Sequence, residues 1–518
     1  MKYTCVDPSE YLYPDITAYK SGTESIHILT PRGSYACAQI FLFEGEGTVS
    51  IECEGWAPEI YEMVPIPVEE NIQITDETRT PYTPVRNAPF EVFDCLKPYD
   101  GCVSFKNGVA AVYFSLPVPQ DAPAGIVRGF VKIGSIRIPV TVEISRAAVP
   151  PESLSVLLYY VRENVSRYHN VQTDSDAFNR LETAYLTMLR RMHQNALWIP
   201  ENDHFPVVTA LGDDRYDFDF TEMASYIRKA FALGYKRIYH RLGYRKSWEE
   251  SAILVHGLPS TSYEGYCWLA QYLTALHRFL KENGWLESYM LSVLDEPREV
   301  NAAEYRSLCN TIRKFAPGIK LIDAISFGFV DGSIDICVPL SEEFENHRAD
   351  YETYRRFGDE IWYYDCCGPR GRGYINRFMD YPLLATRYHG WANYAYNLTG
   401  YLHWAANHYQ PNHDPFRQSC PLHRNTNHES KMPAGDTHIM YPGTDGPWMS
   451  VRMENQRAGY EEYEMLRALA CRNKELADTI CAAGFRSFRD VEYDPLSFRT
   501  ARNALIRALE AVQSEENR

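Results

Sequence analysis

Short apolar runs alternate with turn residues over the first 150 residues, and helical periodicity is almost absent there. The runs have the length and the β-branched content of strands. They lie at residues 36–43, 47–53, 110–114, 125–133 and 136–144. A Val-Pro-Pro segment at 149–151 has the composition of a hinge. The pattern predicts an N-terminal β-sandwich domain over residues 1–150.

After residue 150 the pattern changes to strands that alternate with helices. Apolar runs predict eight strands, at 154–159, 196–200, 237–242, 289–294, 321–326, 334–339, 361–366 and 401–406. Periods near 3.6 residues predict helices between them, at 174–192, 221–233, 263–283, 302–315 and 381–396. The link after the fifth strand is short. Such alternation indicates parallel strands with crossover helices, and we predict a (β/α)8 barrel over residues 151–450.

Amphipathic helical patterns return at the end of the chain, at 451–466 and 497–512. They predict a C-terminal helical extension over residues 451–518 that packs on the barrel. The expected fold class is therefore α/β: a (β/α)8 TIM barrel, preceded by a β-sandwich and followed by C-terminal helices.

The charge of the chain restricts its partners. A formal net charge of −16 over 518 residues, without a cluster of Lys and Arg, argues against nucleic acid and anionic membranes. The N-terminus lacks the apolar core of a signal peptide, and no run approaches the roughly 18 apolar residues of a membrane span. We therefore expect a cytoplasmic protein that acts on a neutral substrate.

Two neighbouring carboxylates, Asp295 and Glu296, end the fourth expected strand in the segment LSVLDEPR. Pro297 removes a backbone donor and stops further pairing. Catalytic groups of barrel enzymes lie at such strand ends. Two acids in a water-poor pocket cannot both ionise easily, so one stays an anion while the pKa of the other rises. This context favours an acid/base pair over a capping role at the helix that begins near Val300.

Further polar and aromatic residues lie near the other strand ends. Sugar-binding sites combine aromatic faces, which stack on the pyranose, with amides, imidazoles and carboxylates, which bind its hydroxyls. Trp198 and Arg241 also lie near these strand ends. The residues that we predict to bind a carbohydrate substrate are His193, Asn195, His240, Tyr364, Asp365, Trp404 and Asn407.

Six histidines and Cys420 lie close together in the sequence, which raises the possibility of a metal site. The histidines are His403, His408, His413, His423, His428 and His438. Their spacing matches neither HExxH nor a zinc finger, and solvated loop histidines are the simpler interpretation. We expect no metal and no cofactor. A GxSxG motif is absent from the sequence, which weakens a serine-hydrolase interpretation.

Several motifs, taken in order, resemble glycoside hydrolase family 123, the β-N-acetylgalactosaminidases with an N-terminal β-sandwich and a (β/α)8 catalytic domain. The resemblance covers most of the chain. It depends on Asp295-Glu296-Pro297, IWYYDCCG at 361–368 with Asn376 and Asp380, GYLHW at 400–404 with Asn407, and YPG at 441–443 with Arg452, Arg457, Gly459 and Tyr463. Members of this family are often exported.

The resemblance implies an exo-acting β-N-acetylhexosaminidase, and specifically a β-N-acetylgalactosaminidase, that uses substrate-assisted retaining hydrolysis. In that scheme the acetamido oxygen of the sugar attacks its own anomeric carbon. Asp295 would orient the acetamido N–H, and Glu296 would act as the acid and then as the base. Tyr364 and Trp404 would enclose the acetamido group. Arg452 and Arg457 are expected to brace the C-terminal helix rather than to touch sugar.

Two alternatives remain open. One is a glycosidase, retaining or inverting, that acts on a sugar without an acetamido group and uses a distant carboxylate such as Asp365. The other is a catalytically inactive carbohydrate-binding protein.

Overall fold

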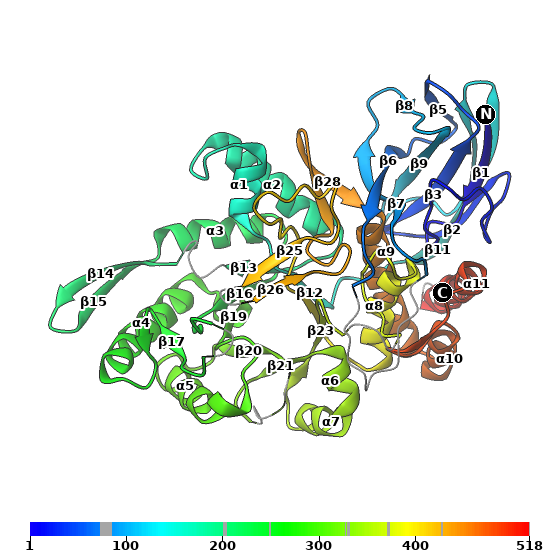
Figure 1. Cartoon of the computed structure of the whole chain (residues 1–518). Helices are drawn as coiled ribbons and strands as arrows, with labels where there is room; N and C mark the ends of the chain where they lie inside the picture. The colour runs from blue at the N-terminus through cyan, green and yellow to red at the C-terminus, as the bar shows by residue number, and fades with distance from the viewer. Residues whose placement is uncertain are drawn as a thin grey trace.

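The structure of the protein is a computed structural model, and it describes residues 1–72, 85–199, 205–247, 250–326, 328, 332–369, 373–425 and 428–516. Three parts follow one another along the chain: a β-sandwich, a barrel of parallel strands with outer helices, and a group of C-terminal helices (Figure 1). The predicted fold class is confirmed. The domain boundaries at residues 150 and 450 stay a prediction.

The sandwich consists of two sheets whose inner faces share one apolar core that includes Ile40, Phe114 and Val140. The larger sheet has the order β1 (Lys2–Val6), β3 (Ser34–Phe43), β9 (Val109–Val118), β6 (Glu59–Val68), β7 (Phe90–Pro98), β28 (Gly446–Ser450) and β27 (Met440–Gly443). The smaller sheet has the order β2 (Ile26–Arg32), β11 (Ile136–Ala148), β10 (Gly125–Ile133) and β5 (Ile51–Glu54). Its largest sheet thus includes a hairpin, β27–β28, that follows the barrel in the sequence.

The barrel has eight strand positions, as predicted. They are β12 (Ser155–Leu158), β13 (Ala196–Ile199), β16 (Arg237–Arg241), β19 (Tyr289–Ser292), β20 (Lys320–Ile325), β21 (Ile336–Pro339), β22 (Glu360–Ile361) continued by β23 (Tyr363–Asp365), and β24 (Gly400–His403). Their ladders are parallel. Between β13 and β12, the Asn195 N–H donates to the Val156 carbonyl at 3.2 Å. Apolar side chains such as Met290, Ile322 and Leu402 fill the interior.

Helices cover the outside of the barrel: α1 (Arg162–His169), α2 (Asp176–Arg191), α3 (Thr221–Ala232), α4 (Tyr263–Asn283), α5 (Ala302–Phe315), α6 (Ser341–Asn346), α7 (Arg348–Arg356) and α8 (Leu384–Ala395). Local sequence sets their ends. In α4, for example, the Ser262 hydroxyl accepts from the Gly265 N–H at 3.0 Å, and Gly284 ends the helix at φ 72°. No helix separates β20 from β21 in the described residues, in agreement with the short link.

Several hairpins of the described structure lie in segments for which the sequence analysis predicted no strands, and two of them follow barrel strands. The β14 (Val207–Gly212) and β15 (Arg215–Asp219) pair projects from the barrel after β13 (Figure 1). The β25 (Leu422–Asn425) and β26 (His428–Lys431) pair lies between β24 and β27. In the sequence, the first hairpin follows the barrel strand β13 and the second follows the barrel strand β24.

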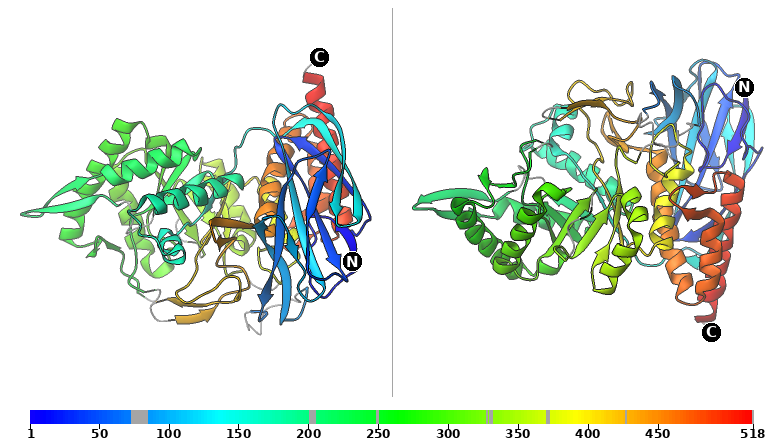
Figure 2. Two further views of the ribbon diagram at one scale, coloured as in Figure 1. Left: turned by 90° about the horizontal axis from the view of Figure 1, so that it is seen from above. Right: turned by 60° about the horizontal axis from the view of Figure 1, so that its bottom comes forward.

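Helix α9 (Val451–Ala470) lies between the sandwich and the barrel, with α10 (Lys474–Gly484) and α11 (Pro495–Glu516) beyond it (Figure 2). Nearly all of its side chains are buried. Its backbone closely approaches α8 at two glycines. A Cβ at Gly459 would lie 2.1 Å from the Arg387 carbonyl oxygen, and one at Gly390 would lie 2.0 Å from the Gly459 carbonyl oxygen. Only glycine fits at this crossing.

Candidate active site

Asp295 and Glu296 follow β19 after two intervening residues, Val293 and Leu294, so both lie at the end of the barrel where the parallel strands terminate. Their backbones have φ values of 76° and 46°, in the left-handed region that non-glycine residues rarely adopt. The Glu296 N–H donates to the Ala324 carbonyl of β20 at 3.0 Å, and the Asp295 N–H donates to the Asp323 carboxylate at 3.1 Å. The turn is thus attached to the next strand.

The side chain of Glu296 points toward β23, where its carboxyl accepts a hydrogen bond from the Tyr364 hydroxyl. Burial and the negative charge of Asp295 raise the pKa of Glu296 to about 7, although Tyr364, Arg245 and Arg241 act in the opposite direction. At neutral pH this carboxyl can therefore both hold and release a proton, as a general acid/base requires.

Asp295 has a cationic partner, since its carboxylate lies 2.9 Å from the guanidinium of Arg241. Its side chain is 27% exposed, so the carboxylate is accessible at the barrel mouth. Arg245 donates to its backbone carbonyl at 3.2 Å. Two neighbouring acids thus occupy different environments: Asp295 next to a cation, and Glu296 in a desolvated position with a neutral donor.

Aromatic side chains line the barrel mouth from the first, second and third strand positions. The Tyr159 ring stacks on Trp198 at 4.6 Å between centroids, and its hydroxyl donates to the Tyr239 hydroxyl at 3.0 Å. Within the described residues, the buried indole N–H of Trp198 has no hydrogen-bond partner. These rings offer a stacking surface and one unused donor, both of which a sugar can occupy.

The eighth strand position contributes Trp404, whose indole N–H donates to the Asp436 carboxylate at 3.1 Å. Its ring centroid lies 4.8 Å from that of His408 and 5.4 Å from that of His423. Tyr364, Trp198 and Trp404 belong to the same apolar cluster inside the barrel. The structure therefore brings four of the sequence-predicted site residues to the mouth: Asp295, Glu296, Tyr364 and Trp404.

His193 and Asn195 do not lie at this mouth, because they precede β13 and so belong to the opposite end of the barrel. His193 lies between Glu152 and Glu461, at 3.4 and 3.3 Å. The Asn195 amide binds the carbonyl of Leu154 at 2.7 Å. Both residues hold the barrel floor together, which corrects their prediction as substrate ligands.

His240 and Asp365 lie on the outer side of their strands, because side chains alternate along a strand and their neighbours Tyr239 and Tyr364 point inward. His240 bonds to the Tyr289 hydroxyl, and burial lowers its pKa to about 3. Asp365 accepts from the Tyr401 hydroxyl at 2.6 Å and lies 2.9 Å from His389 of α8. Neither side chain faces the barrel interior.

Asn407 also differs from its predicted role as a substrate ligand. Its amide accepts from the Val161 N–H at 2.8 Å and donates to the Val161 carbonyl at 3.0 Å, so it holds the segment that precedes α1.

The sequence-based site omitted Tyr159 and Tyr239, and it named Trp198 and Arg241 near the strand ends without counting them among the substrate ligands. Their signal was the two-residue alternation: Tyr239 and Arg241 share the inward face of β16, and His240 between them does not. Counting every second residue from the apolar interior toward the strand end would have selected these side chains.

No group of three His, Cys, Asp or Glu side chains among the described residues could hold a metal ion. In the same part of the chain, no helix combines the length and the apolar character that a membrane crossing requires. Of the histidines near the eighth strand, His408 and His423 flank Trp404, and burial lowers the pKa of each.

Comparisons with known proteins agree with this architecture. The model of the glycoside hydrolase 123 catalytic domain matches residues 160–469. A family 123 glycoside hydrolase from Clostridium perfringens, whose structural description concerns glycolipid glycan hydrolysis, has 12% sequence identity and a TM-score of 0.74, covering 99% of this chain and 98% of its own. A family 2 β-galacturonidase from Eisenbergiella tayi has 10% identity and a TM-score of 0.35, covering 82% and 69%.

A search of curated proteins found no match. The family model spans well over half of the chain, and the similar fold extends over nearly all of it. The catalytic-domain match includes the strand end that carries Asp295 and Glu296. The chain therefore belongs to glycoside hydrolase family 123.

Proposed function

We propose that this glycoside hydrolase is an exo-acting β-N-acetylhexosaminidase, with terminal β-linked N-acetylgalactosamine as its substrate. The observation that carries the proposal is the adjacent acid pair, in which burial raises the pKa of Glu296 to about 7 while Arg241 lies 2.9 Å from Asp295. The glycolipid glycans named for the Clostridium perfringens enzyme support a glycoconjugate substrate.

In the first step, the acetamido oxygen of the sugar attacks its own anomeric carbon. The bond from that carbon to the leaving oxygen breaks, and Glu296 gives its proton to the leaving oxygen. Asp295 accepts a hydrogen bond from the acetamido N–H and stabilises the positive charge of the oxazolinium ring that forms. The pair supplies an acid and an anion at the same time, as this step needs.

In the second step, the ionised Glu296 takes a proton from a water molecule whose oxygen attacks the anomeric carbon. The carbon–oxygen bond of the oxazolinium ring breaks, and the acetamido group is restored. Two displacements at one carbon give net retention of configuration. Glu296 ends the cycle protonated, and its pKa near 7 suits both directions of transfer.

The position of Asp365 argues against a double displacement with a protein nucleophile. That alternative needs a second carboxylate that reaches the anomeric carbon. The Asp365 side chain is buried outside the barrel interior, where Tyr401 and His389 engage it. A scheme in which the substrate supplies its own nucleophile does not need that residue.

Turnover of aryl glycosides tests this function. We expect hydrolysis of aryl β-N-acetylgalactosaminide, slower hydrolysis of the gluco epimer, and no turnover of aryl β-galactoside or α-arabinoside. A thiazoline analogue of the oxazolinium ring should inhibit, and Asp295→Asn should lose at least ~100-fold in kcat. Asp213→Asn on the exposed β14–β15 turn serves as the matched control.

Two results would contradict the proposal. An active enzyme that the thiazoline does not inhibit would favour a sugar without an acetamido group. Measurable sugar binding without turnover on any aryl glycoside would instead identify a carbohydrate-binding protein.

A further inference from the structure

The strand after β19 places a third carboxylate, that of the fully buried Asp323 of β20, beneath the turn that carries the catalytic pair. One oxygen of Asp323 accepts from the Ser292 hydroxyl at 2.5 Å and the Asp295 N–H at 3.1 Å. The other accepts from three donors: the Val293 N–H at 3.1 Å, the Leu294 N–H at 3.2 Å and the Tyr305 hydroxyl at 2.5 Å. Five donors thus converge on one side chain.

Four of the five donors come from consecutive residues, 292 to 295, where the chain leaves the strand, and the fifth is the Tyr305 hydroxyl of α5. A strand that ends normally directs its N–H groups to a neighbouring strand. Here three successive N–H groups turn toward a single carboxylate, and Asp295 and Glu296 then adopt φ values of 76° and 46°. Such a conformation persists in non-glycine residues only where the surroundings hold it, and Asp323 supplies those contacts.

Asp323 takes part in no ion pair in the described parts of the chain, which distinguishes it from those buried acids that pair with a cation. Asp94 in β7, for example, lies 3.0 Å from Arg452 and accepts from Tyr441 at 2.6 Å. A buried carboxylate without a cation is costly to keep as an anion unless hydrogen bonds stabilise it. Within the described residues, this carboxylate accepts hydrogen bonds from the 292–295 turn and from Tyr305.

We propose that Asp323 is a positioning residue for catalysis: it holds the 292–296 turn in the conformation that directs Glu296 at the leaving oxygen. The inference rests on the roles assigned to Asp295 and Glu296 under the proposed function. Asp323 itself lies behind the backbone of the turn and does not touch the substrate. Its effect therefore passes through the placement of Glu296.

The test uses Asp323→Asn, which keeps the size of the side chain but accepts at only one of its two positions. Two or more turn donors then face an amide NH2 group, and the turn relaxes. We expect kcat on an aryl glycoside with a poor leaving group, such as phenol, to fall by ~100-fold, with KM within about threefold. With 2,4-dinitrophenol, which needs less protonation, the loss should be only ~10-fold.

The matched control is Asp94→Asn, which disrupts a buried carboxylate network of similar size at the sandwich and α9. It should lower thermal stability. Any loss of kcat per folded molecule, relative to the wild type, should be the same for the two leaving groups. Tyr305→Phe and Ser292→Ala each remove one donor and keep the carboxylate. Both should show a several-fold loss that is larger for phenol, and they keep the test available if Asp323→Asn does not fold.

Equal losses for the two leaving groups, in Asp323→Asn or in both single-donor variants, would overturn the inference. So would an Asp94→Asn control with the same leaving-group dependence. All measurements use the aryl glycoside that the wild type hydrolyses fastest. Failure of the N-acetylgalactosaminidase proposal would therefore appear in the wild-type substrate panel, whereas failure of the positioning role would appear in the ratio between leaving groups.

Discussion

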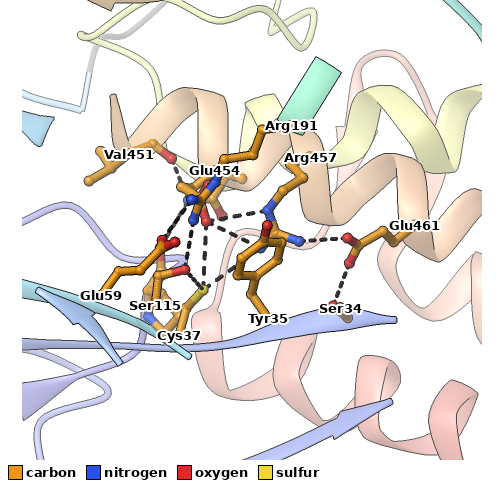
Figure 3. A network of polar contacts seen from close by, with 12 residues as sticks. Ser34, Tyr35, Cys37, Glu59, Ser115, Arg191, Val451, Glu454, Arg457 and Glu461 are labelled. Carbon is orange, nitrogen blue, oxygen red and sulfur yellow. Dashed lines mark hydrogen bonds and ion pairs between the residues drawn. The ribbon is translucent and has the colours of Figure 1, made fainter. Parts of the chain in front are cut away.

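The environment of a largely buried glutamate at the barrel mouth differs from that of the buried glutamates on α9. At the barrel mouth, burial and a neighbouring anion raise the pKa of Glu296 to about 7. On α9, Glu461 lies 2.7 Å from Arg457 and accepts from the Ser34 hydroxyl at 2.5 Å (Figure 3). It also lies 3.3 Å from His193. Burial opposes ionisation there too, but Arg457 and His193 outweigh it and lower the pKa of Glu461 to about 2.

The cations that contact each carboxylate account for this difference in pKa. Glu454 of α9 lies 3.0 Å from Arg191 and 3.2 Å from Arg457, and the two arginines lower its pKa against the effect of burial. At the mouth, Arg241 pairs with Asp295, while a neutral hydroxyl contacts Glu296. A buried carboxylate that is fully paired with cations stays ionised and has a structural role. A buried carboxylate without such a pair can gain and lose a proton near neutral pH.

The largest expected effect is on catalysis at the mouth. Glu296→Gln keeps the shape of the side chain but cannot give up a proton, so we expect kcat on a phenyl glycoside to fall by about 10³-fold or more. Steady-state kinetics with purified protein measures this loss. Glu461→Gln is the control, and it should retain kcat per folded molecule. Near wild-type turnover by Glu296→Gln would exclude its role as the acid.

The next largest effect concerns stability on α9. Arg457→Met removes the cation that Glu454 and Glu461 share and leaves buried carboxylates without compensation, so we expect a loss of about 3–5 kcal/mol in the free energy of unfolding. Denaturant unfolding at pH 7 measures it. Arg486→Met, whose partner Asp490 is exposed, should cost less than about 1 kcal/mol. Similar losses of stability in both variants would contradict the conclusion that the buried ion pairs of α9 stabilise the fold more than an exposed pair does.

A smaller effect is the pH dependence of stability. The pKa of Glu296 rises from 4.5 to about 7 on folding. Its contribution to the free energy of unfolding is therefore fully present below pH 4.5 and is lost as pH rises through 7. Glu296→Gln does not titrate, and at pH 8 its free energy of unfolding should exceed that of the wild type by on the order of 3 kcal/mol, with little difference at pH 4.5. Thermal unfolding across this range measures the change.

Glu461→Gln should behave in the opposite way. The folded pKa of Glu461 is about 2, below its usual 4.5, so its contribution is present above pH 4.5 and is lost as pH falls toward 2. The glutamine variant should therefore be less stable than the wild type at pH 7 and approach it in acid. The same sign of pH dependence in the two variants would contradict the comparison.

The smallest expected effect comes from Tyr364→Phe. The Tyr364 hydroxyl donates to Glu296 and favours its anion, so its removal should raise the pKa of Glu296 further. The descending limb of the pH profile of kcat/KM should move to higher pH, with kcat reduced by about tenfold or less. A shift to lower pH would show that the hydroxyl does not contact the ionised acid.

Much of the fold follows from sequence periodicity. The helices expected at 263–283 and 302–315 match α4 and α5, because long amphipathic stretches repeat one spacing over several turns. The position of Asp295 and Glu296 at the barrel mouth was also predictable, since a strand that ends in two acids and a proline is an unusual pattern. The β25–β26 hairpin was not predicted, because its polar segment lacks apolar alternation.

The remaining errors have a common physical origin. His193 and Asn195 were assigned to the wrong end of a strand, and His240 and Asp365 to the wrong face, because a shift of a few positions or of one residue reverses which surface a side chain occupies. Asp323 had a sequence signal, a single acid within the buried run KLIDAI. Its five donors, however, come from segments that only the fold brings together.

The central claim is that, near neutral pH, Glu296 holds the catalytic proton beside Asp295, whose carboxylate pairs with Arg241. The pH dependence of kcat/KM for the free enzyme on an aryl β-N-acetylgalactosaminide tests it most directly. The account predicts a descending limb near pH 7 that Glu296→Gln abolishes together with most of the activity. A wild-type profile that stays level from pH 5 to pH 9, or a limb that persists in Glu296→Gln, would contradict it.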